Sequence, residues 1–456
     1  MKSLKTILLL VIGLSATSYG QSVVLETYIR EGLTNNEAIK QQNFNLERNI
    51  YALKEATGLF MPSISLKTDY VDGKGGRGID IPIGDLMNPV YGNLNQINGV
   101  LAPGSPQYPT LNNISQQLNP SNFYNAYIRA SLPIVNAEIW YNRKIKKDQV
   151  GLQQAEVAIY KRELVKDIQL AYFNYLKATA AISIYENALG LVKESERVNQ
   201  KLVDNGKEVV FVLSRSKSEV SKIEAQLSNA QNTKKNAAAY FNFLLNKPLE
   251  SEITVDEQLL KNMVLLPQTP AANSAKREEL NKLATARNIA YSVLRLKKSS
   301  WIPTLGAQLD LGSQASNFEW NKKSQYYLFG LSFDWKLFTG LQDVYKVKQA
   351  KFDVQALESQ TRYVQNQLTL SSTTTANSYA SALEQYKSAI TEESTSGQYF
   401  NLINKRYKEG QALYIEFLDA RNENTLASLK KSITYFDAWI KYSESVRANA
   451  DYNLNK

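Results

Sequence analysis

An internal repeat constrains the fold of this chain more than any other feature. Pro62 ends an amphipathic helical stretch and opens a segment of alternating apolar and polar residues, and Pro303 does the same in the second half. In each half a second alternating segment follows, then a very long helical stretch, a glycine and a returning helical stretch. A repeat of this size favours one body built from two similar halves over unrelated domains.

We therefore predict a first structural repeat at residues 21–250, in which a long insert at 72–121 separates two strands. A second repeat is expected at residues 275–456. Prolines interrupt the pattern between the repeats, so residues 251–274 are expected to form a connector of mixed, partly irregular structure.

The composition excludes several classes of function. The chain has no Cys and no His, which removes disulfides, thiolate nucleophiles, the usual triad base and the commonest metal ligand. We therefore expect no enzymatic activity, no cofactor and no metal site. The formal net charge is +10, but Lys and Arg alternate with Glu and Asp along the helical stretches, so we expect no binding to nucleic acid.

The N-terminus predicts a secretory signal at residues 1–20. Lys2 and Lys5 precede an apolar run at residues 7–14, and small and polar residues follow up to Gly20. After this segment no stretch approaches the roughly 20 apolar residues that a transmembrane helix needs. If the mature protein enters a membrane, it must do so as strands.

Helical periodicity predicts a short, a long and a returning helix in each half. At about 1.5 Å per residue these would span roughly 40, 100 and 60 Å, so a short and a returning helix stacked end to end would match one long helix. Such columns of equal height could form the wall of a tube, although the sequence leaves open which short helix stacks on which. The predicted helices cover residues 33–60, 138–204 and 209–246, and then residues 275–300, 341–408 and 414–451.

Four alternating segments predict strands, each with the length that a tilted strand needs to cross a bilayer. They are residues 63–71, the segment that ends at Pro133, residues 304–312 and residues 327–335. A closed membrane barrel needs at least about 8 strands, and an open edge in lipid costs several kcal/mol per unpaired backbone group. A membrane-spanning subunit must therefore oligomerise. A soluble sheet would show the same alternation, so a soluble periplasmic coiled-coil structural or adaptor-like protein remains the alternative.

The insert is rich in Gly, Pro and Asn, and we expect it to form a plug or a surface cap. Its glycines Gly73, Gly75 and Gly78 match the spacing of a dinucleotide-binding loop. No helix is expected to follow, because residues 79–83 are extended in character and contain Pro82. The pattern therefore does not predict a dinucleotide site.

One segment of the second half carries a family resemblance. It runs Arg406-Tyr407-Lys408-Glu409-Gly410 and continues with Glu416 and the pair Asp419-Ala420. The corresponding turn in the first half keeps Gly206 but has Val212 and Arg215 in place of the two acids. With these features, the chain resembles the outer membrane efflux protein family, the TolC-like channels, over nearly its whole mature length.

The resemblance implies a mainly α fold with a transmembrane β-barrel portion. Long antiparallel helices would form a periplasmic α-barrel, and each protomer would contribute four β-strands to the shared barrel of a homotrimer. Such a protein would lie in the outer membrane of a Gram-negative bacterium, in contact with its lipid, and would have a large periplasmic part. It would act as a passive exit duct in a tripartite efflux or secretion system, with a periplasmic adaptor and an inner-membrane pump as partners.

The resemblance also places the two glycine turns at the periplasmic tip, where the adaptor would dock. The turn residues are Asn205, Gly206, Lys207, Glu409, Gly410 and Gln411.

Glu416 and Asp419 lie three residues apart and therefore share one face of a helix. Three copies around an axis would place a ring of carboxylates in a narrow mouth, an arrangement that selects cations. We predict that these acids line the constriction, that Tyr407 helps to hold the turn, and that Arg215 pairs with one of the acids across helices. Two solvated acids at the end of a helix are the other interpretation.

Overall fold

The computed structural model describes residues 22–206, 209–261, 266–268, 270 and 273–454. The predicted signal at residues 1–20 lies outside them. The chain divides into two compact units, which we describe separately. The helical unit comprises residues 1–51, 146–291 and 351–456, and the sheet unit comprises residues 52–145 and 292–350.

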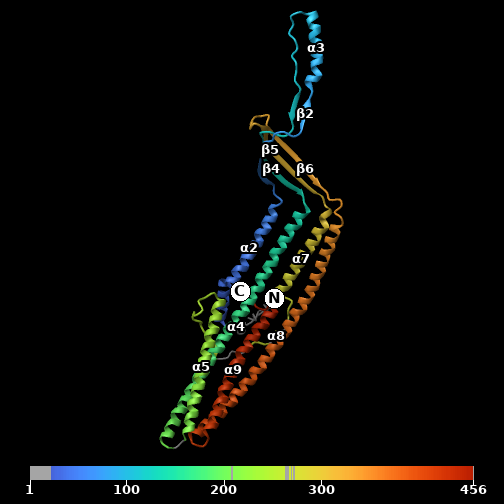
Figure 1. Cartoon of the computed structure of the whole chain (residues 1–456). Coiled ribbons are helices and arrows are strands. Elements are labelled where there is room, and N and C mark those ends of the chain that lie inside the picture. Colours follow the sequence, from blue (N-terminus) through green and yellow to red (C-terminus); the bar gives the residue numbers. More distant parts are fainter. Residues whose placement is uncertain (1–21, 207–208, 262–265, 269, 271–272, 455–456) are drawn as a thin grey trace, which may run out of the picture. The chain divides into compact units, whose positions relative to one another are not determined.

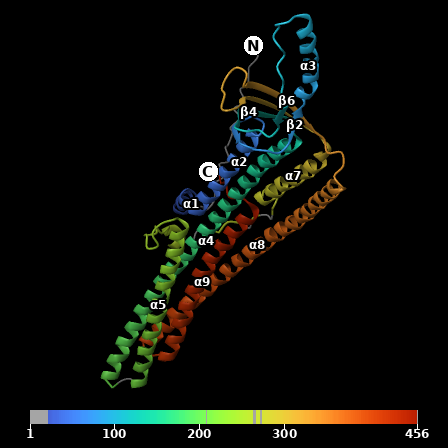
Figure 2. The ribbon, with the colours of Figure 1, turned by 45° about the horizontal axis from the view of Figure 1, so that its top comes forward.

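The helical unit contains two antiparallel helix pairs (Figure 1 and Figure 2). In the first pair the 68-residue helix α4 (Ala137–Asp204) is followed by the 35-residue helix α5 (Val210–Leu244). In the second pair the 67-residue helix α8 (Gln342–Lys408) is followed by the 36-residue helix α9 (Tyr414–Asn449). The matching lengths confirm the predicted repeat. The described residues of the connector include a short helix, α6 (Glu257–Lys261).

The first short helix is split in two, which the sequence analysis missed. Instead of one helix from residue 33, the chain forms α1 (Val23–Asn35) and α2 (Glu37–Gly58). Asn36 between them has an extended backbone, and its side-chain oxygen accepts hydrogen bonds from the backbone N–H groups of Ala38 (3.0 Å) and Ile39 (3.2 Å). Asn36 therefore ends α1 and caps α2, because asparagine satisfies the free donors of a helix start.

Contacts at the helix ends show which short helix follows which. The side-chain NH₂ group of Asn36, at the start of α2, donates to the backbone carbonyl of Leu244 at the end of α5 (2.9 Å). In the second half Arg277, which precedes α7 (Glu278–Lys298), donates to the Ala448 carbonyl near the end of α9 (3.4 Å). The start of α2 thus meets the end of α5, and the start of α7 meets the end of α9.

The main core of the helical unit is aromatic. Tyr172 of α4, Phe241 of α5 and Tyr435 of α9 are fully buried in one cluster. The Tyr172 hydroxyl also accepts a hydrogen bond from the backbone N–H of Asp256 (2.9 Å), which anchors the connector to α4. This cluster buries apolar side chains of α4 where both repeats and the connector meet.

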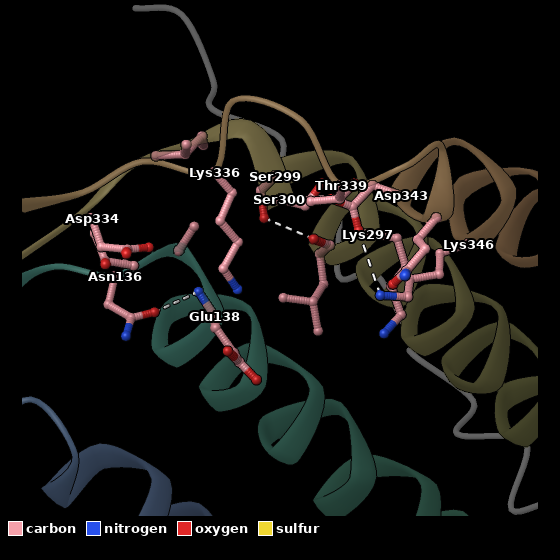
Figure 3. A pocket seen from close by; sticks show the side chains of 15 residues that line it. Asn136, Glu138, Lys297, Ser299, Ser300, Asp334, Lys336, Thr339, Asp343 and Lys346 are labelled. Atoms are coloured by element: carbon pink, nitrogen blue, oxygen red, sulfur yellow. Dashed lines mark hydrogen bonds and ion pairs between the residues drawn. The ribbon is translucent and has the colours of Figure 1, made fainter.

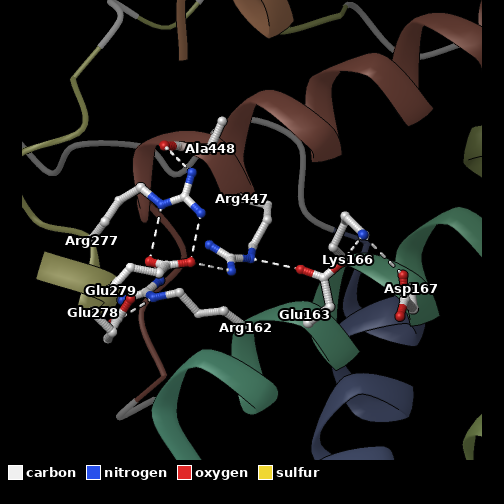
Figure 4. A network of polar contacts seen from close by, with 9 residues as sticks. All are labelled: Arg162, Glu163, Lys166, Asp167, Arg277, Glu278, Glu279, Arg447 and Ala448. Atoms are coloured by element: carbon white, nitrogen blue, oxygen red, sulfur yellow. Dashed lines mark hydrogen bonds and ion pairs between the residues drawn. The ribbon is translucent and has the colours of Figure 1, made fainter. Parts of the chain in front are cut away.

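A charged network ties α4, α7 and α9 together (Figure 4). Arg447 of α9 donates to Glu163 of α4 (3.0 Å) and to Glu279 of α7 (2.8 Å), and Arg277 donates to both carboxylate oxygens of Glu279 (3.1 and 2.6 Å). Burial by itself would raise the pKa of Glu279. The hydrogen bonds from Arg277 and Arg447 outweigh it and lower that pKa to about 2.

The sheet unit is built on four antiparallel strands in the order β1-β4-β5-β6. The predicted strands are confirmed, although β4 and β5 extend further because they pair with each other from Phe123–Ser316 onward. In the described part of the chain, β1 and β6 each pair with one strand only and form the two edges. The strands are β1 (Ser63–Val71), β4 (Phe123–Val135), β5 (Thr304–Ser316) and β6 (Gln325–Asp334), and the short helix η1 (Ser299–Trp301) precedes β5.

The insert contains a helix, so the expectation that none follows its glycines was wrong. The short strands β2 (Gly78–Ile81) and β3 (Ile114–Gln117) pair with each other, and between them lies the 19-residue helix α3 (Ile83–Leu101). Pro82 does not prevent this helix, because proline is tolerated where helix N–H groups have no partner, and Pro82 is its N-cap residue.

The glycine segment still lacks a dinucleotide-binding loop. The backbone of Gly75 is bonded to Gln117 (3.0 Å) and Asn119 (2.8 Å), and β2 separates this segment from α3. No helix N-terminus therefore follows the glycines directly, as phosphate binding would require.

Candidate functional site

Both glycine turns have a left-handed backbone at the glycine. Gly206 has φ +71° and Gly410 has φ +74°, a region that residues with a Cβ atom rarely adopt. Figures 1 and 2 show the two turns at the same end of the helical unit. Lys207, one of the predicted docking residues, lies outside the described residues.

Two backbone hydrogen bonds of the second turn cap the C-terminal end of α8. The backbone N–H of Gln411 donates to the Arg406 carbonyl (2.8 Å), and that of Gly410 donates to the Tyr407 carbonyl (3.0 Å). These two bonds form a Schellman motif, which satisfies the last carbonyls of a helix and places a left-handed residue after it. The spacing from Arg406 to Gly410 in the sequence signature therefore reflects a helix end.

Replacing Gly410 with alanine is expected to destabilise this turn by about 1–2 kcal/mol, because a Cβ atom strains a left-handed residue. Among the described residues nothing lies within 4 Å of the position of that Cβ atom, so the strain is expected to come from the backbone. Faster hydrogen exchange in the last turn of α8 would measure it. Gly190, within α4 and with similarly open space, is the matched control, and G190A should stabilise the chain by up to about 1 kcal/mol.

A chain of uncharged polar groups connects the two helix pairs near these turns. The Tyr407 hydroxyl donates to the side-chain oxygen Oδ1 of Asn199 (2.8 Å), and the side-chain Nδ2 of Asn199 donates to Ser216 Oγ (2.7 Å). Ser216 Oγ lies 2.8 Å from the Tyr414 hydroxyl. Asn199 and Ser216 are buried, so these bonds hold α4 and α5 against the turn between α8 and α9.

Glu416 and Asp419 occupy different environments. A carboxylate oxygen of Glu416 accepts a hydrogen bond from the backbone N–H of Leu413 (2.8 Å), so Glu416 caps the start of α9. Asp419 is exposed on the same helix. Tyr407 packs on Phe417, with ring centroids 4.9 Å apart. The two acids thus lie beside the turn, and Tyr407 lies beneath it.

Arg215 has a different carboxylate partner from the one expected. Its Nη2 atom lies 3.5 Å from Glu219, four residues along the same helix, so within one chain it pairs with neither Glu416 nor Asp419 in the described residues. Glu219 also accepts from Nη2 of Arg421 (3.0 Å). The side chains of Glu219 and Arg421 are 5% and 1% exposed. This buried pair joins α5 to α9 and was missed, because periodicity does not show which charged residue faces inward.

The sheet has one apolar and one polar face. Leu66, Ile128, Leu311 and Tyr327 lie in register across all four strands on one face. Leu66 is 73% exposed and Tyr327 78% exposed, far more than such side chains tolerate in water as a continuous patch. This face has the character of a lipid-facing surface.

The opposite face is held by polar pairs. Arg129 of β4 donates to both carboxylate oxygens of Asp310 of β5 (2.8 and 2.9 Å), and Gln308 donates to the same carboxylate (2.9 Å). A bidentate pair of this kind fixes both side chains. The alternation predicted from the sequence therefore separates a face suited to lipid from a face suited to water.

A cavity of about 320 Å³ lies in the sheet unit, where the strands meet the helices (Figure 3). Its lining includes three lysines and three carboxylates, of which Lys346 and Asp343 form an ion pair (3.5 Å). Asn136 caps α4 through the Glu138 N–H (2.9 Å), and Asp343 accepts from Thr339 (3.0 Å). The charged residues of the lining are Glu138, Lys297, Asp334, Lys336, Asp343 and Lys346. The positive and negative charges of this set are equal in number.

Within the described residues, no group of three or more acidic side chains is placed to hold a metal ion. No helix of that part of the chain has the length and apolarity to cross a membrane.

Comparison with known proteins decides between the two interpretations left open by the sequence. The outer membrane efflux protein family matches residues 28–247 and 272–432, most of the chain. The chain belongs to this family. It is therefore an outer membrane efflux channel protein rather than a soluble adaptor-like protein. No curated protein sequence matches it.

Solved structures of outer membrane channels share this fold at low sequence identity. The open state of Neisseria gonorrhoeae MtrE has a TM-score of 0.75 at 14% identity, with 93% of this chain and 88% of that chain covered. Campylobacter jejuni CmeC has a TM-score of 0.74 at 12% identity, with 95% and 87% covered. Vibrio cholerae VceC has a TM-score of 0.71 at 13% identity, with 93% and 95% covered.

Proposed function

We propose that three copies of this efflux channel protein close one barrel in the outer membrane of a Gram-negative bacterium and extend a helical tunnel into the periplasm. The observation that carries the proposal is the four-stranded sheet with an exposed apolar face and two unpaired edges. Unpaired backbone groups in lipid cost several kcal/mol each, so the edge strand β6 of one copy must pair with β1 of the next.

The duct performs no chemistry. Solutes delivered by an inner-membrane pump pass through it, and a periplasmic adaptor docks at the two glycine turns. The absence of His and Cys from the sequence supports this passive role. The purified protein should migrate on gels as a heat-modifiable oligomer, fractionate with the outer membrane and form ion channels in planar bilayers. A water-soluble monomer that forms no channels would contradict the proposal.

We also propose that Glu416 and Asp419 line the constriction of this duct. Replacing both with alanine is expected to weaken block by multivalent cations by about tenfold, equal to about 1.4 kcal/mol of lost cation binding, and to reduce selectivity for cations. Single-channel recording measures both quantities. Because Glu416 also caps α9, the variant Glu416→Gln with Asp419→Asn helps to separate charge from helix capping.

A charge-matched control removes two exposed acids from α8. Replacing Glu384 and Glu392 with alanine deletes the same charge per chain, at residues paired with Lys387 and Lys430 rather than beside the turn. It should leave cation block unchanged. Equal effects of the two double variants, or no effect of removing Glu416 and Asp419, would exclude the constriction role.

A further inference from the structure

Helix α3 of the insert is held on one side by the chain that returns from it. The Asn88 side chain makes two hydrogen bonds with the backbone of Leu111 (2.9 and 2.7 Å), and the Asn95 side chain makes the same pair with the backbone of Tyr108 (3.1 and 2.7 Å). The two asparagines are two helical turns apart and therefore share a face. Helix α3 and the segment that returns from it lie side by side in Figures 1 and 2 and are joined by these hydrogen bonds.

A second face of α3 is apolar and uncovered. Its side chains recur in steps of three or four residues, the spacing of one helical face. They are Leu86, Val90, Leu94, Ile97 and Leu101, and all are exposed, with Leu86 at 67% and Leu101 at 78%. We call these five residues the apolar stripe. A third face carries Pro89, Gly92, Gln96 and Gly99.

We propose that the apolar stripe packs against the same stripe of other copies of this chain, so that the α3 helices form a bundle beyond the end of the sheet. This inference rests on the proposed trimer. The insert joins the end of the edge strand β1 to the start of β4, so rotational symmetry carries the stripe of every copy to the same height around one axis. Steps of three and four are also the spacing with which helices pack in coiled coils.

The charge of α3 favours a second copy over other occupants. Asp85, in the first turn, is the one charged residue of the helix, so identical stripes can meet without repulsion. A helix that lies on a membrane surface normally carries Lys and Arg on its polar face, and α3 has neither. A stripe of this size left in water would be an interaction site without a partner.

Cysteine cross-linking tests the bundle, because the natural chain has no cysteine. In the full-length protein in membranes, I97C places a thiol on the apolar stripe. Q96C places one on the third face of the same helix, which carries Gln96. Under mild oxidation, I97C should form at least about ten times more disulfide-linked dimer than Q96C on non-reducing gels, since a disulfide requires nearby thiols. A second stripe position, V90C, two turns away, should behave like I97C.

The oligomer is measured separately on the same preparations. Intact, heat-modifiable trimers with little cross-linking at I97C and V90C would overturn the bundle and leave the proposed duct standing. Equal cross-linking of I97C and Q96C would also overturn it, because it would reflect random collision. Loss of the trimer from the unmodified protein would instead refute the proposed function. Quenching of a fluorophore attached to I97C by spin-labelled lipid would assign the stripe to the membrane and overturn the proposal.

Discussion

Replacing Arg421 with methionine is expected to destabilise the packing of α5 against α9 by about 3–5 kcal/mol, the cost of removing one member of a buried ion pair. The remaining neighbour of Glu219, Arg215, is exposed and 3.5 Å away, so it should compensate little. Glu219 and Arg421 are almost fully buried and 3.0 Å apart, so water cannot take the place of the lost arginine. Thermal unfolding of the purified protein and hydrogen exchange along α5 and α9 would measure the effect.

Two variants make this prediction specific. Arg215→Met removes the same charge next to the same carboxylate, but its side chain is 58% exposed and should contribute less than about 1 kcal/mol. Replacing Glu219 with leucine together with Arg421→Met should recover most of the lost stability, because a buried pair is often replaceable by apolar residues. Nε and Nη1 of Arg421 have no hydrogen-bond partner among the residues that the structure describes, which strengthens that expectation. Equal losses for Arg421→Met and Arg215→Met would contradict it.

The free energy of unfolding is expected to fall by about 3 kcal/mol as the pH falls through the titration range of Glu279. Arg277 and Arg447 hold the folded-state pKa of this carboxyl at about 2, below its ordinary value of 4.5. A lowered folded pKa contributes stability that is present above about pH 4.5 and is lost on the way down to about pH 2. Glu163, whose pKa is also lowered, adds to the loss in the same direction.

Denaturant unfolding at several pH values would measure this loss, with Glu279→Gln as the decisive variant. The variant should be less stable than the natural chain at neutral pH and should lose the Glu279 part of the acid dependence. Glu384→Gln is the control, because its pair with Lys387 is exposed and should barely change the pH profile. An unchanged profile in Glu279→Gln would show that other carboxyls govern acid stability.

The four strands and the long helices could be predicted from the sequence, whereas elements that depend on single side chains or on contacts distant in the chain could not. The four strands and the long helices α4 and α8 follow from alternation and from helical spacing. The break at Asn36 depends on one side chain that caps the next helix, and the spacing of apolar residues does not reveal such a cap. Helix α3 was not predicted, because Pro82 favours an extended chain. The hydrogen bonds that hold the helix join its asparagines to backbone groups more than ten residues further along the insert.

The turns of the candidate site were predictable because glycine is needed where φ is positive, as at Gly206 and Gly410. Their polar contacts were not predictable. Asn199 and Tyr407 lie on helices of different repeats, so only the folded chain brings them together. For the same reason the sequence could not show that Arg215 pairs with Glu219 on its own helix rather than with an acid on another helix.

The open edges of the sheet also affect how such a protein is made. Before it joins the other copies of the proposed trimer, a newly exported subunit would carry unpaired strand edges at β1 and β6 and a large apolar surface, the combination that drives aggregation. We therefore expect the sheet to remain unfolded or chaperone-bound during transit through the periplasm. If the proposed trimer is correct, we expect strand pairing, assembly and entry into lipid to occur together during biogenesis. A subunit that stalls before this step would then be open to proteolysis.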